Sequence, residues 1–454
     1  MNNTLARTIF HLIEHVRGEK VASYLKELEG NQFLARDEIS MIQAEKLRSL
    51  LIHATTYNNY YKEKYKGHDI DGPFERLPIL TKEELRMSYK EILSGNKLSK
   101  LDLVETSGST GIPLKFYRDR VIFGYTLASM WRARRWWGID IGDKEAMLWG
   151  VPVRFTGKIK VKAKDFLLNR FRERQYNLCP DTLYHFYSQI KRKKPDYLFG
   201  YSSMVYEFAI FLRENNLHKE HGYLKAAICT AEKIYPYQRT VIEETLGCRV
   251  VSEYGSTETG IISYECQSGT SHISDDCVYV EIVDQNNNLQ PEGEAGRVLV
   301  TVLNSLSSPI IRYDLGDIAT KLSGGCPCGR NLSILGEIEG RTSDVVIGPN
   351  GKIFHSIIFY YIVKALTEKV GGIKHFKVIQ TKIDELEFHL VKSEDFQNAT
   401  EVFIKEQINK KFGSSMKLKF VYCDTIRRSP SGKLRDFETE LDTNAILLRH
   451  YGAQ

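Results

Sequence analysis

The sequence predicts an α/β protein of two unequal domains, a large N-terminal domain of layered β-sheets and helices and a small α+β C-terminal domain. Three observations support this. From about residue 100, short β-rich runs alternate with helical stretches, and the pattern changes near residues 340–352. In addition, 42% of the 454 residues are hydrophobic, which is enough for a large core. We therefore expect residues 1–342 to form the large domain and residues 343–454 the small one.

The first hundred residues are predicted to be helical. Apolar residues recur at three- and four-residue spacing in LIEHVRGEKVASYLKELEG and in EISMIQAEKLRSLLIHATTYNNYYKEKY. Thr81, followed three residues later by Glu84, has the pattern of a capping box and predicts another helix start. The apolar patch at the beginning contains Glu14 and His15, so it reads as an amphipathic helix and not as a secretory signal.

The rest of the chain supplies the expected strands and further helices. Strands are predicted in AMLWGVPV, PDYLFGYSS, KAAICT, RVVSEYG and RVLVTVL. In the small domain we expect helices in SIIFYYIVKALTEKV and EVFIKEQINKKF, and strands in LEFHLVK and KLKFVYC. No run approaches the roughly 18 apolar residues of a membrane helix. Because eight cysteines are too few for a disulfide scaffold in this length, we expect a reducing, cytoplasmic location.

The charge balance is modest. The formal net charge of +6 and a pI near 8.6 disfavour a dedicated nucleic-acid-binding protein. Tryptophans and arginines alternate over residues 131–137 and could form a stacking platform for bases, but a helix with one apolar face fits them as well, and we favour it.

Residues 105–113 read ETSGSTGIP, a loop rich in hydroxyl groups and glycine. Backbone N–H groups and hydroxyls of such a loop can bind phosphate oxygens, and glycine permits close approach. An ordinary turn is the alternative interpretation. The spacing of a Walker loop is absent.

Further motifs follow in order: EYGSTETG at 253–260, IRYDLGD at 311–317, GRTSD at 340–344 and SPSGKLR at 429–435. In this order and spacing they resemble the adenylate-forming superfamily, which includes the acyl–coenzyme A synthetases. With LPILTKEELR and CPCGR they resemble its phenylacetate–coenzyme A ligase branch, together with the CapK-like relatives of capsular polysaccharide biosynthesis. The resemblance covers roughly residues 75–437.

The resemblance implies a two-step reaction. A carboxylate attacks the α-phosphate of ATP to give an acyl-adenylate and pyrophosphate, and the acyl group then passes to coenzyme A. An amine, such as an amino sugar or amino acid, is the alternative acceptor, and a non-catalytic nucleotide-binding relative is a second alternative. The small domain is expected to be mobile, so that it serves both steps. The chain is expected to act as a monomer or a homodimer.

Residue roles carry over from the matching motifs. Lys433 matches the catalytic lysine, Thr257 the residue at the α-phosphate and Glu258 the Mg²⁺ ligand, and oxygen ligands of this kind suit Mg²⁺. Ser343 and Asp344 match the hinge. The residues expected to bind the nucleotide are Thr106, Ser107, Gly108, Ser109, Thr110, Gly111, Glu253, Tyr254, Gly255, Ser256, Thr257, Asp317 and Arg341.

Some positions depart from the family pattern. Ile112 stands where the phosphate loop often has a lysine, and Lys115 is near but out of register. Ser343 replaces an aspartate or lysine, and His355 stands where relatives often have proline. We therefore expect phosphate binding to depend more on backbone and hydroxyl groups.

The acyl pocket is expected on two of the predicted strands and beside the EYGSTE motif. Its candidate residues are Phe199, Tyr201, Ser202, Thr230, Ala231 and Tyr254. Ordinary core packing would explain most of them equally well. The basic stretch at residues 158–174 could meet coenzyme A phosphates, an acidic carrier protein or anionic lipid, although a solvated basic face is the default interpretation.

A structural zinc site is also predicted. Cys266 and His272 lie in YECQSGTSHIS, and Cys326 and Cys328 lie in GGCPCGR. Three cysteines and one histidine are a known closed zinc set, although the Cys-x-Cys spacing is tighter than usual. Reduced cysteines in loops are the alternative, and Cys277 is an alternate ligand. The other cysteines are expected to be buried small hydrophobes: Cys179, Cys229, Cys248 and Cys423.

Overall fold

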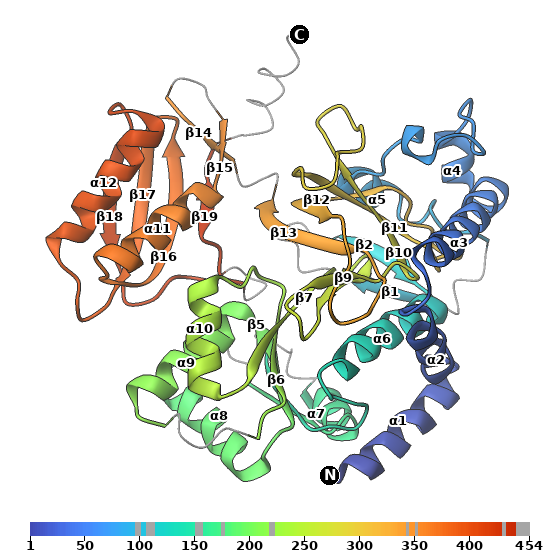
Figure 1. Cartoon of the computed structure of the whole chain (residues 1–454), viewed down its shortest axis with the longest axis horizontal. Coiled ribbons are helices and arrows are strands. Elements are labelled where there is room, and N and C mark those ends of the chain that lie inside the picture. Colours follow the sequence, from blue (N-terminus) through green and yellow to red (C-terminus); the bar gives the residue numbers. More distant parts are fainter. Residues whose placement is uncertain are drawn as a thin grey trace. The chain divides into compact units, whose positions relative to one another are not determined.

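The computed structural model describes residues 1–95, 101–105, 114–149, 158–173, 178–217, 223–341, 345–349, 353–428 and 433–441 (Figure 1). These residues divide into two compact units. The first comprises residues 1–315 and 319–337, and the second comprises residues 316–318, 338–428 and 433–441. The mixed α/β class predicted from the sequence is confirmed.

The first unit begins with helices, as predicted. They are α1 (Asn3–Arg17), α2 (Val21–Asn31), α3 (Arg36–Tyr57), α4 (Asn59–Lys64), the 3₁₀-helix η1 (Phe74–Arg76) and α5 (Lys82–Ser88). The capping box is present at α5: the Thr81 amide donates to Glu84 Oε2 at 2.8 Å, and the Glu84 amide donates to Thr81 Oγ1 at 3.1 Å. Within the described part of the chain, no helix has both the length and the apolar character needed to cross a membrane.

Among the described residues, eleven strands form one sheet, in the order β10-β11-β12-β13-β9-β8-β7-β6-β5-β3-β4. Their bounds are β3 (Glu145–Leu148), β4 (Arg170–Glu173), β5 (Tyr197–Tyr201), β6 (Ala226–Thr230), β7 (Arg249–Ser256), β8 (Gly260–Glu265), β9 (Ser271–Ile273), β10 (Val278–Val283), β11 (Gly296–Val302), β12 (Tyr313–Leu322) and β13 (Ile334–Arg341). A separate hairpin pairs β1 (Asp102–Glu105) with β2 (Lys115–Arg118).

The half of the sheet from β7 to β4 is parallel and carries helices on both faces. The helices are α6 (Arg120–Arg135), α7 (Lys158–Leu167), α8 (Pro180–Lys193), α9 (Ser202–Glu214) and α10 (Pro236–Leu246). The last three pack their apolar residues against β3, β5 and β6 to form the largest described core, as parallel strands require. The carboxyl ends of β5, β6 and β7 therefore meet at one edge of the sheet, where α/β proteins commonly bind ligands.

The second unit has its own core. A four-stranded sheet in the order β18-β17-β16-β19 packs against α11 (Ile357–Lys369) and α12 (Asn398–Phe412). Its strands are β16 (Ile373–Lys382), β17 (Glu385–Lys392), β18 (Lys417–Tyr422) and β19 (Phe437–Thr439), and a small hairpin joins β14 (Val345–Ile347) to β15 (Ile353–His355). Both helices and both strands predicted for this region are present, whereas β16 has no counterpart in the sequence prediction.

Two expectations from the sequence need correction. Cys179 is exposed at the start of α8 and Cys423 is only partly buried, because neither residue faces a core, whereas Cys229 and Cys248 are buried as expected.

Candidate active site and candidate metal centre

Strand register aligns three of the predicted site residues. Tyr201 on β5 pairs with Thr230 on β6, and Thr230 pairs with Glu253 on β7. Two of these residues were expected in the acyl pocket and the third in the nucleotide site. Because the three strands are parallel, the row lies at the carboxyl edge, so residues from both predicted sites meet there.

The EYGSTE segment forms the end of β7 and its turn into β8. A β-bulge falls between Tyr254 and Gly255. A Cβ at Gly255 would lie 2.3 Å from the Gly260 carbonyl oxygen, so only glycine allows this close approach. Across the turn, the Thr259 amide donates to Ser256 Oγ at 3.1 Å. The hairpin therefore fixes the two residues at its tip.

Those two residues are Thr257 and Glu258. Thr257 is exposed and Glu258 is partly exposed, so a hydroxyl and a carboxylate are accessible at the tip of the hairpin. A hydroxyl donor suits a phosphate oxygen, and a carboxylate suits Mg²⁺, which prefers hard oxygen ligands. The residue types at this turn therefore fit a nucleotide phosphate with its metal ion.

Glu253 differs from its neighbours because it is buried, with 8% of its surface exposed. Burial raises the pKa of its carboxyl group, although the positive charge of Arg134 and a hydrogen bond with Thr230 oppose the rise. Among the described residues, its Oε2 atom has no hydrogen-bond partner. Glu253 is therefore a buried carboxyl group at this edge of the sheet and not one of its accessible groups.

An aromatic group walls the predicted acyl pocket. Trp149, which follows β3, stacks on Phe199 with ring centroids 5.5 Å apart and planes inclined by 8°. It also contacts Tyr201 at 4.4 Å. Gly200 lets β3 and β5 approach closely, since a Cβ there would lie 2.7 Å from the Leu148 carbonyl oxygen. The sequence prediction missed Trp149. The feature that could have pointed to it is the position of an aromatic residue directly after a strand predicted to be buried.

The end of β6 has unusual backbone geometry. Ala231 adopts a left-handed conformation with φ of 67°, which costs a non-glycine residue about 1–2 kcal/mol. The next residue, Glu232, holds this corner: its Oε2 accepts from the Ser203 amide and its carbonyl from Ser202 Oγ, both at 2.9 Å. Sequence analysis missed Glu232, whose carboxylate binds the start of α9.

The remaining predicted residues are distributed as follows. Asp317 lies on β12 and is assigned, like Arg341 and Lys433, to the second unit. Arg341 ends β13, and its side chain lies outside the described part of the chain. The predicted phosphate loop, Thr106–Gly111, and the predicted hinge residues Ser343 and Asp344 also lie outside the described residues.

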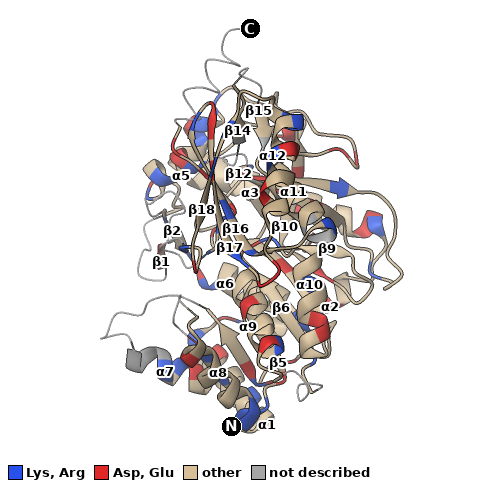
Figure 2. Ribbon diagram, turned by 90° about the vertical axis from the view of Figure 1, so that its left-hand side faces the viewer, with Lys and Arg blue, Asp and Glu red and all other residues tan. Residues whose placement is uncertain are grey.

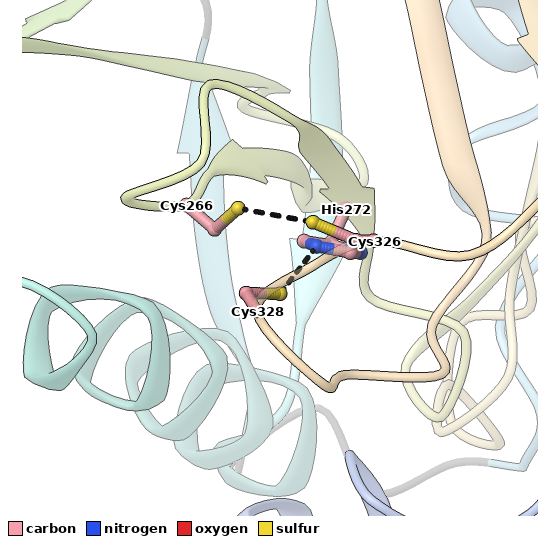
Figure 3. Close-up of side chains that lie close together, drawn as sticks. All are labelled: Cys266, His272, Cys326 and Cys328. Carbon is pink, nitrogen blue, oxygen red and sulfur yellow. Dashed lines mark hydrogen bonds between the residues drawn. The ribbon is translucent and has the colours of Figure 1, made fainter.

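The predicted zinc ligands form one cluster (Figure 3). Cys266 follows β8, His272 lies on β9, and Cys326 and Cys328 lie in the loop before β13. Their ligand atoms are all within 4.8 Å of one another. Cys266 Sγ is 3.6 Å from Cys326 Sγ, and His272 Nε2 is 3.2 Å from Cys328 Sγ. Three thiols and one imidazole at this mutual distance match a closed tetrahedral Zn²⁺ site.

The surroundings of the cluster favour the metal-binding forms of its ligands. Burial lowers the pKa of His272, which keeps the imidazole neutral. Its Nδ1 lies 3.3 Å from the Leu332 carbonyl oxygen, and donation there leaves Nε2 as the metal ligand. Burial opposes ionisation of Cys326, but hydrogen bonds from the Thr270 hydroxyl and from Cys328 lower its pKa to about 7. Thiolate is therefore accessible near neutral pH.

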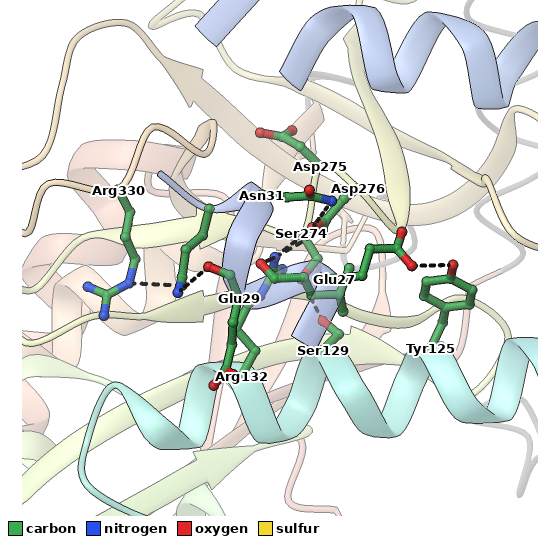
Figure 4. Close-up of polar contacts among 12 residues, drawn as sticks. Glu27, Glu29, Asn31, Tyr125, Ser129, Arg132, Ser274, Asp275, Asp276 and Arg330 are labelled. Carbon is green, nitrogen blue, oxygen red and sulfur yellow. Dashed lines mark hydrogen bonds and ion pairs between the residues drawn. The ribbon is translucent and has the colours of Figure 1, made fainter. Parts of the chain in front are cut away.

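A buried polar network holds the segment after His272 (Figure 4). Arg132 on α6 binds Asp276 at 2.8 Å, and both side chains are only 1% exposed. Ser129 and Ser274 share a hydrogen bond of 2.8 Å. The Arg330 side chain in the cysteine loop donates to Gln32 Oε1 at 3.3 Å. The network therefore connects α2 and α6 to both parts of the cluster.

Two family patterns match the chain. Residues 174–304 match the AMP-binding enzyme family, and residues 346–437 match the CapK C-terminal domain. Protein CapK of Staphylococcus aureus is 23% identical over 415 residues, which cover 88% of this chain and 89% of CapK. Phenylacetate-coenzyme A ligase of Thermus thermophilus is 25% identical over 400 residues, covering 82% of this chain and 85% of that protein.

Together these matches support the phenylacetate–coenzyme A ligase and CapK branch of the AMP-binding enzymes for this chain. The matched AMP-binding region contains β5 to β8, and so it includes the row at the carboxyl edge and the hairpin. The AMP-binding match and the similarity to phenylacetate-coenzyme A ligase support an AMP-forming ligase.

Solved structures have the same fold as this AMP-binding enzyme. 2-Hydroxyisobutyryl-CoA ligase in complex with 2-HIB-AMP aligns with a TM-score of 0.74 at 21% identity, covering 93% of this chain and 94% of that one. The amide bond synthetase McbA from Marinactinospora thermotolerans aligns with a TM-score of 0.51 at 15% identity, covering 78% of this chain and 69% of McbA. At these identities the likeness concerns the fold alone.

Proposed function

We propose that this ligase activates a carboxylic acid with ATP and then transfers the acyl group to coenzyme A. In the first step a carboxylate oxygen attacks the α-phosphorus, and the bond to pyrophosphate breaks. In the second step the thiolate sulfur attacks the acyl carbon, and AMP leaves. The observation that supports this proposal most strongly is the row of Tyr201, Thr230 and Glu253, because it brings residues predicted for the acyl and nucleotide sites to one sheet edge.

Each named residue would have a distinct task. The Thr257 hydroxyl would donate to the α-phosphate, and the Asp317 carboxylate would accept both ribose hydroxyls. Lys433 would neutralise the negative charge that develops at the reacting centre. Glu258 would hold Mg²⁺, which would supply positive charge at the phosphates. Phe199, Tyr201 and Trp149 would exclude water from the bound acid.

An amine acceptor is the alternative, and two comparisons leave it open. The C-terminal region matches the CapK domain at residues 346–437, and CapK is among the similar proteins. If the second unit forms the acceptor site, an amino sugar or amino acid would take the place of coenzyme A as the nucleophile. The acyl-adenylate step would be unchanged.

A panel of acids and acceptors tests the proposal. Full-length protein would be incubated with ATP, Mg²⁺ and each acid, and pyrophosphate release would be measured. Acids that react would then be tested with coenzyme A or with amines, and the products identified by mass spectrometry. Formation of a coenzyme A thioester would support the proposal. Formation of amides without any thioester would instead support the amine alternative. Absence of acid-dependent pyrophosphate release would instead favour a non-catalytic nucleotide-binding relative.

We also propose that Cys266, His272, Cys326 and Cys328 hold a structural Zn²⁺ ion. The ion would connect the β8–β9 hairpin with the loop before β13. Elemental analysis of protein purified without added metal should give about one zinc per chain. A zinc content far below that value in protein of normal stability would contradict the assignment.

A further inference from the structure

The first helix exposes a continuous apolar stripe. In α1 the exposed fractions of Leu5, Leu12 and Val16 are 54%, 63% and 75%. With the partly buried Ile9, these residues recur at spacings of four, three and four, which places them on one face of the helix. The other face packs against the protein, where Phe10 meets Trp131 edge to face at 6.3 Å. The stripe is therefore a surface feature of a helix that is held on its other side.

Basic and acidic residues near this stripe differ in their exposure to solvent. The charged residues exposed in the first twenty positions are all basic: Arg7, Arg17 and Lys20. The two acids of the same segment, Glu14 and Glu19, are only 7% and 5% exposed. Glu14 is also used internally, because its Oε1 accepts from the Ala22 amide at 2.6 Å. The exposed charged side chains of this segment are therefore basic, although Arg7 pairs with Asp140 and Arg17 pairs with Glu19.

Helix α7 contacts α1 and repeats this arrangement. Lys162 is exposed and Phe166 is 64% exposed, whereas Asp165 is 5% exposed and accepts from Arg172 Nε at 2.8 Å. Burial lowers the pKa of Lys164 on α7, and the positive charges of Arg170, Arg17 and Arg172 lower it further. Because Arg17 belongs to α1, basic residues of both helices lie in one region. Figure 2 marks Lys and Arg residues on α1 and on α7.

We propose that this surface, formed by Leu5, Leu12 and Val16 of α1 and by Lys162 and Phe166 of α7, binds an anionic lipid bilayer. We name it the α1–α7 surface. Amphipathic helices of this kind lie in the headgroup region, with apolar side chains in the acyl boundary and basic side chains at anionic lipids. The proposal concerns where the enzyme works and does not depend on its acyl acceptor.

The charge pattern favours lipid over a second copy of the chain. In a symmetric dimer the same patch faces itself, which would bring the exposed Lys162 side chains of both copies together. An acidic lipid surface instead complements these charges and accommodates isolated large aliphatic side chains. The acid at the rim, Asp140, is 29% exposed and already pairs with Arg7 at 3.1 Å and with Arg135 at 2.8 Å.

Vesicle flotation tests the proposal with the full-length protein. We expect the protein to float with vesicles of phosphatidylglycerol and phosphatidylcholine, and to remain unbound with pure phosphatidylcholine. Raising the salt concentration should weaken binding, because part of the attraction is electrostatic. The double change Leu12→Gln and Val16→Gln should reduce the bound fraction at least about tenfold, since it removes two apolar contacts.

Controls separate this result from damage to the fold. Met87→Gln changes an equally exposed residue on α5, at 73% exposure, and should float like the wild type. The Leu12/Val16 variant should keep the wild-type melting temperature and the wild-type rate of pyrophosphate release. Equal flotation of both variants, or no flotation with anionic vesicles at low salt, would overturn the proposal. A dimer in analytical ultracentrifugation that the double variant dissociates would assign the surface to a second copy instead.

Discussion

At the scale of single residues, burial decides what a carboxyl group can do. Glu253 and Glu258 are five residues apart in one motif, yet the first is buried beneath the sheet edge and the second lies at the accessible tip of the hairpin. Burial raises the pKa of Glu253, so the folded protein disfavours its ionised form. The same residue type therefore supports the structure at one position and is available to a metal ion at the other.

We predict that Glu253→Gln makes stability less sensitive to rising pH. In the unfolded chain Glu253 loses its proton near pH 4.3, whereas the raised pKa keeps it protonated longer in the folded protein. The stability of the wild type should therefore fall as pH rises above that value, and the variant should lack this loss. Urea unfolding between pH 5 and pH 8 measures the two slopes.

The exposed Glu294 provides the matched control, since Glu294→Gln should reproduce the wild-type slope. If the free energy of unfolding of the wild type and of Glu253→Gln changed with pH in the same way, ionisation of the buried carboxyl group would not destabilise the folded protein.

At the scale of elements, the cysteine and histidine cluster joins two segments that are far apart in the sequence. The loop between β12 and β13 contains exposed glycines and no regular structure over residues 323–333. Its contacts include the cluster, Gln32 and Leu34 of the N-terminal region, and Asp275, which accepts from the Ser333 amide at 2.5 Å. A metal ion would add a further link between this loop and the β8–β9 hairpin.

We predict that Cys328→Ser abolishes stoichiometric zinc binding and lowers the melting temperature by several degrees, because a structural metal contributes directly to folding. Cys423→Ser is the control, since Cys423 lies outside the cluster and should change neither zinc content nor melting temperature appreciably. Normal zinc content in the Cys328 variant would exclude that residue as a ligand.

At the scale of the whole molecule, the chain separates its parts between two units with independent cores. The hairpin residues Thr257 and Glu258 belong to the first unit, whereas Asp317 and Lys433 belong to the second. The second core is built from α11, α12 and the four-stranded sheet. Each unit can therefore stay folded when a single reactive side chain is removed.

We predict that Lys433→Ala lowers acid-dependent pyrophosphate exchange at least about 100-fold, because positive charge at the reacting centre is lost. The melting temperature should stay near that of the wild type. Lys411→Ala removes an exposed lysine from the end of α12 in the same unit and should leave exchange unchanged. Exchange at the wild-type rate in the Lys433 variant would refute the catalytic role.

Local patterns explain why much of the fold was predictable. The capping box at Thr81, the helical N-terminal region and the strands in KAAICT and RVVSEYG all depend on spacing within a few residues. Strand β16 was missed because Gln380 stands on its buried face, after Phe376 and Val378, where a strand pattern would have an apolar residue. In the structure Gln380 is fully buried. Its side-chain Oε1 accepts from the Ile347 backbone amide at 3.0 Å, and its Nε2 donates to the Ile347 carbonyl oxygen at 2.7 Å.

The sequence by itself determined the motif order, the family resemblance and the ligand set of the candidate metal centre, because these depend on residue types and spacing. Only the tertiary structure decided which side chains are buried. Arg132 and Arg134 have no local pattern that predicts burial, yet both are 1% exposed, since Asp276 and Glu145 neutralise them from elsewhere in the chain. Likewise, Trp149 reaches the predicted pocket only because β3 lies beside β5. Such partners come together by folding, and no local pattern records them.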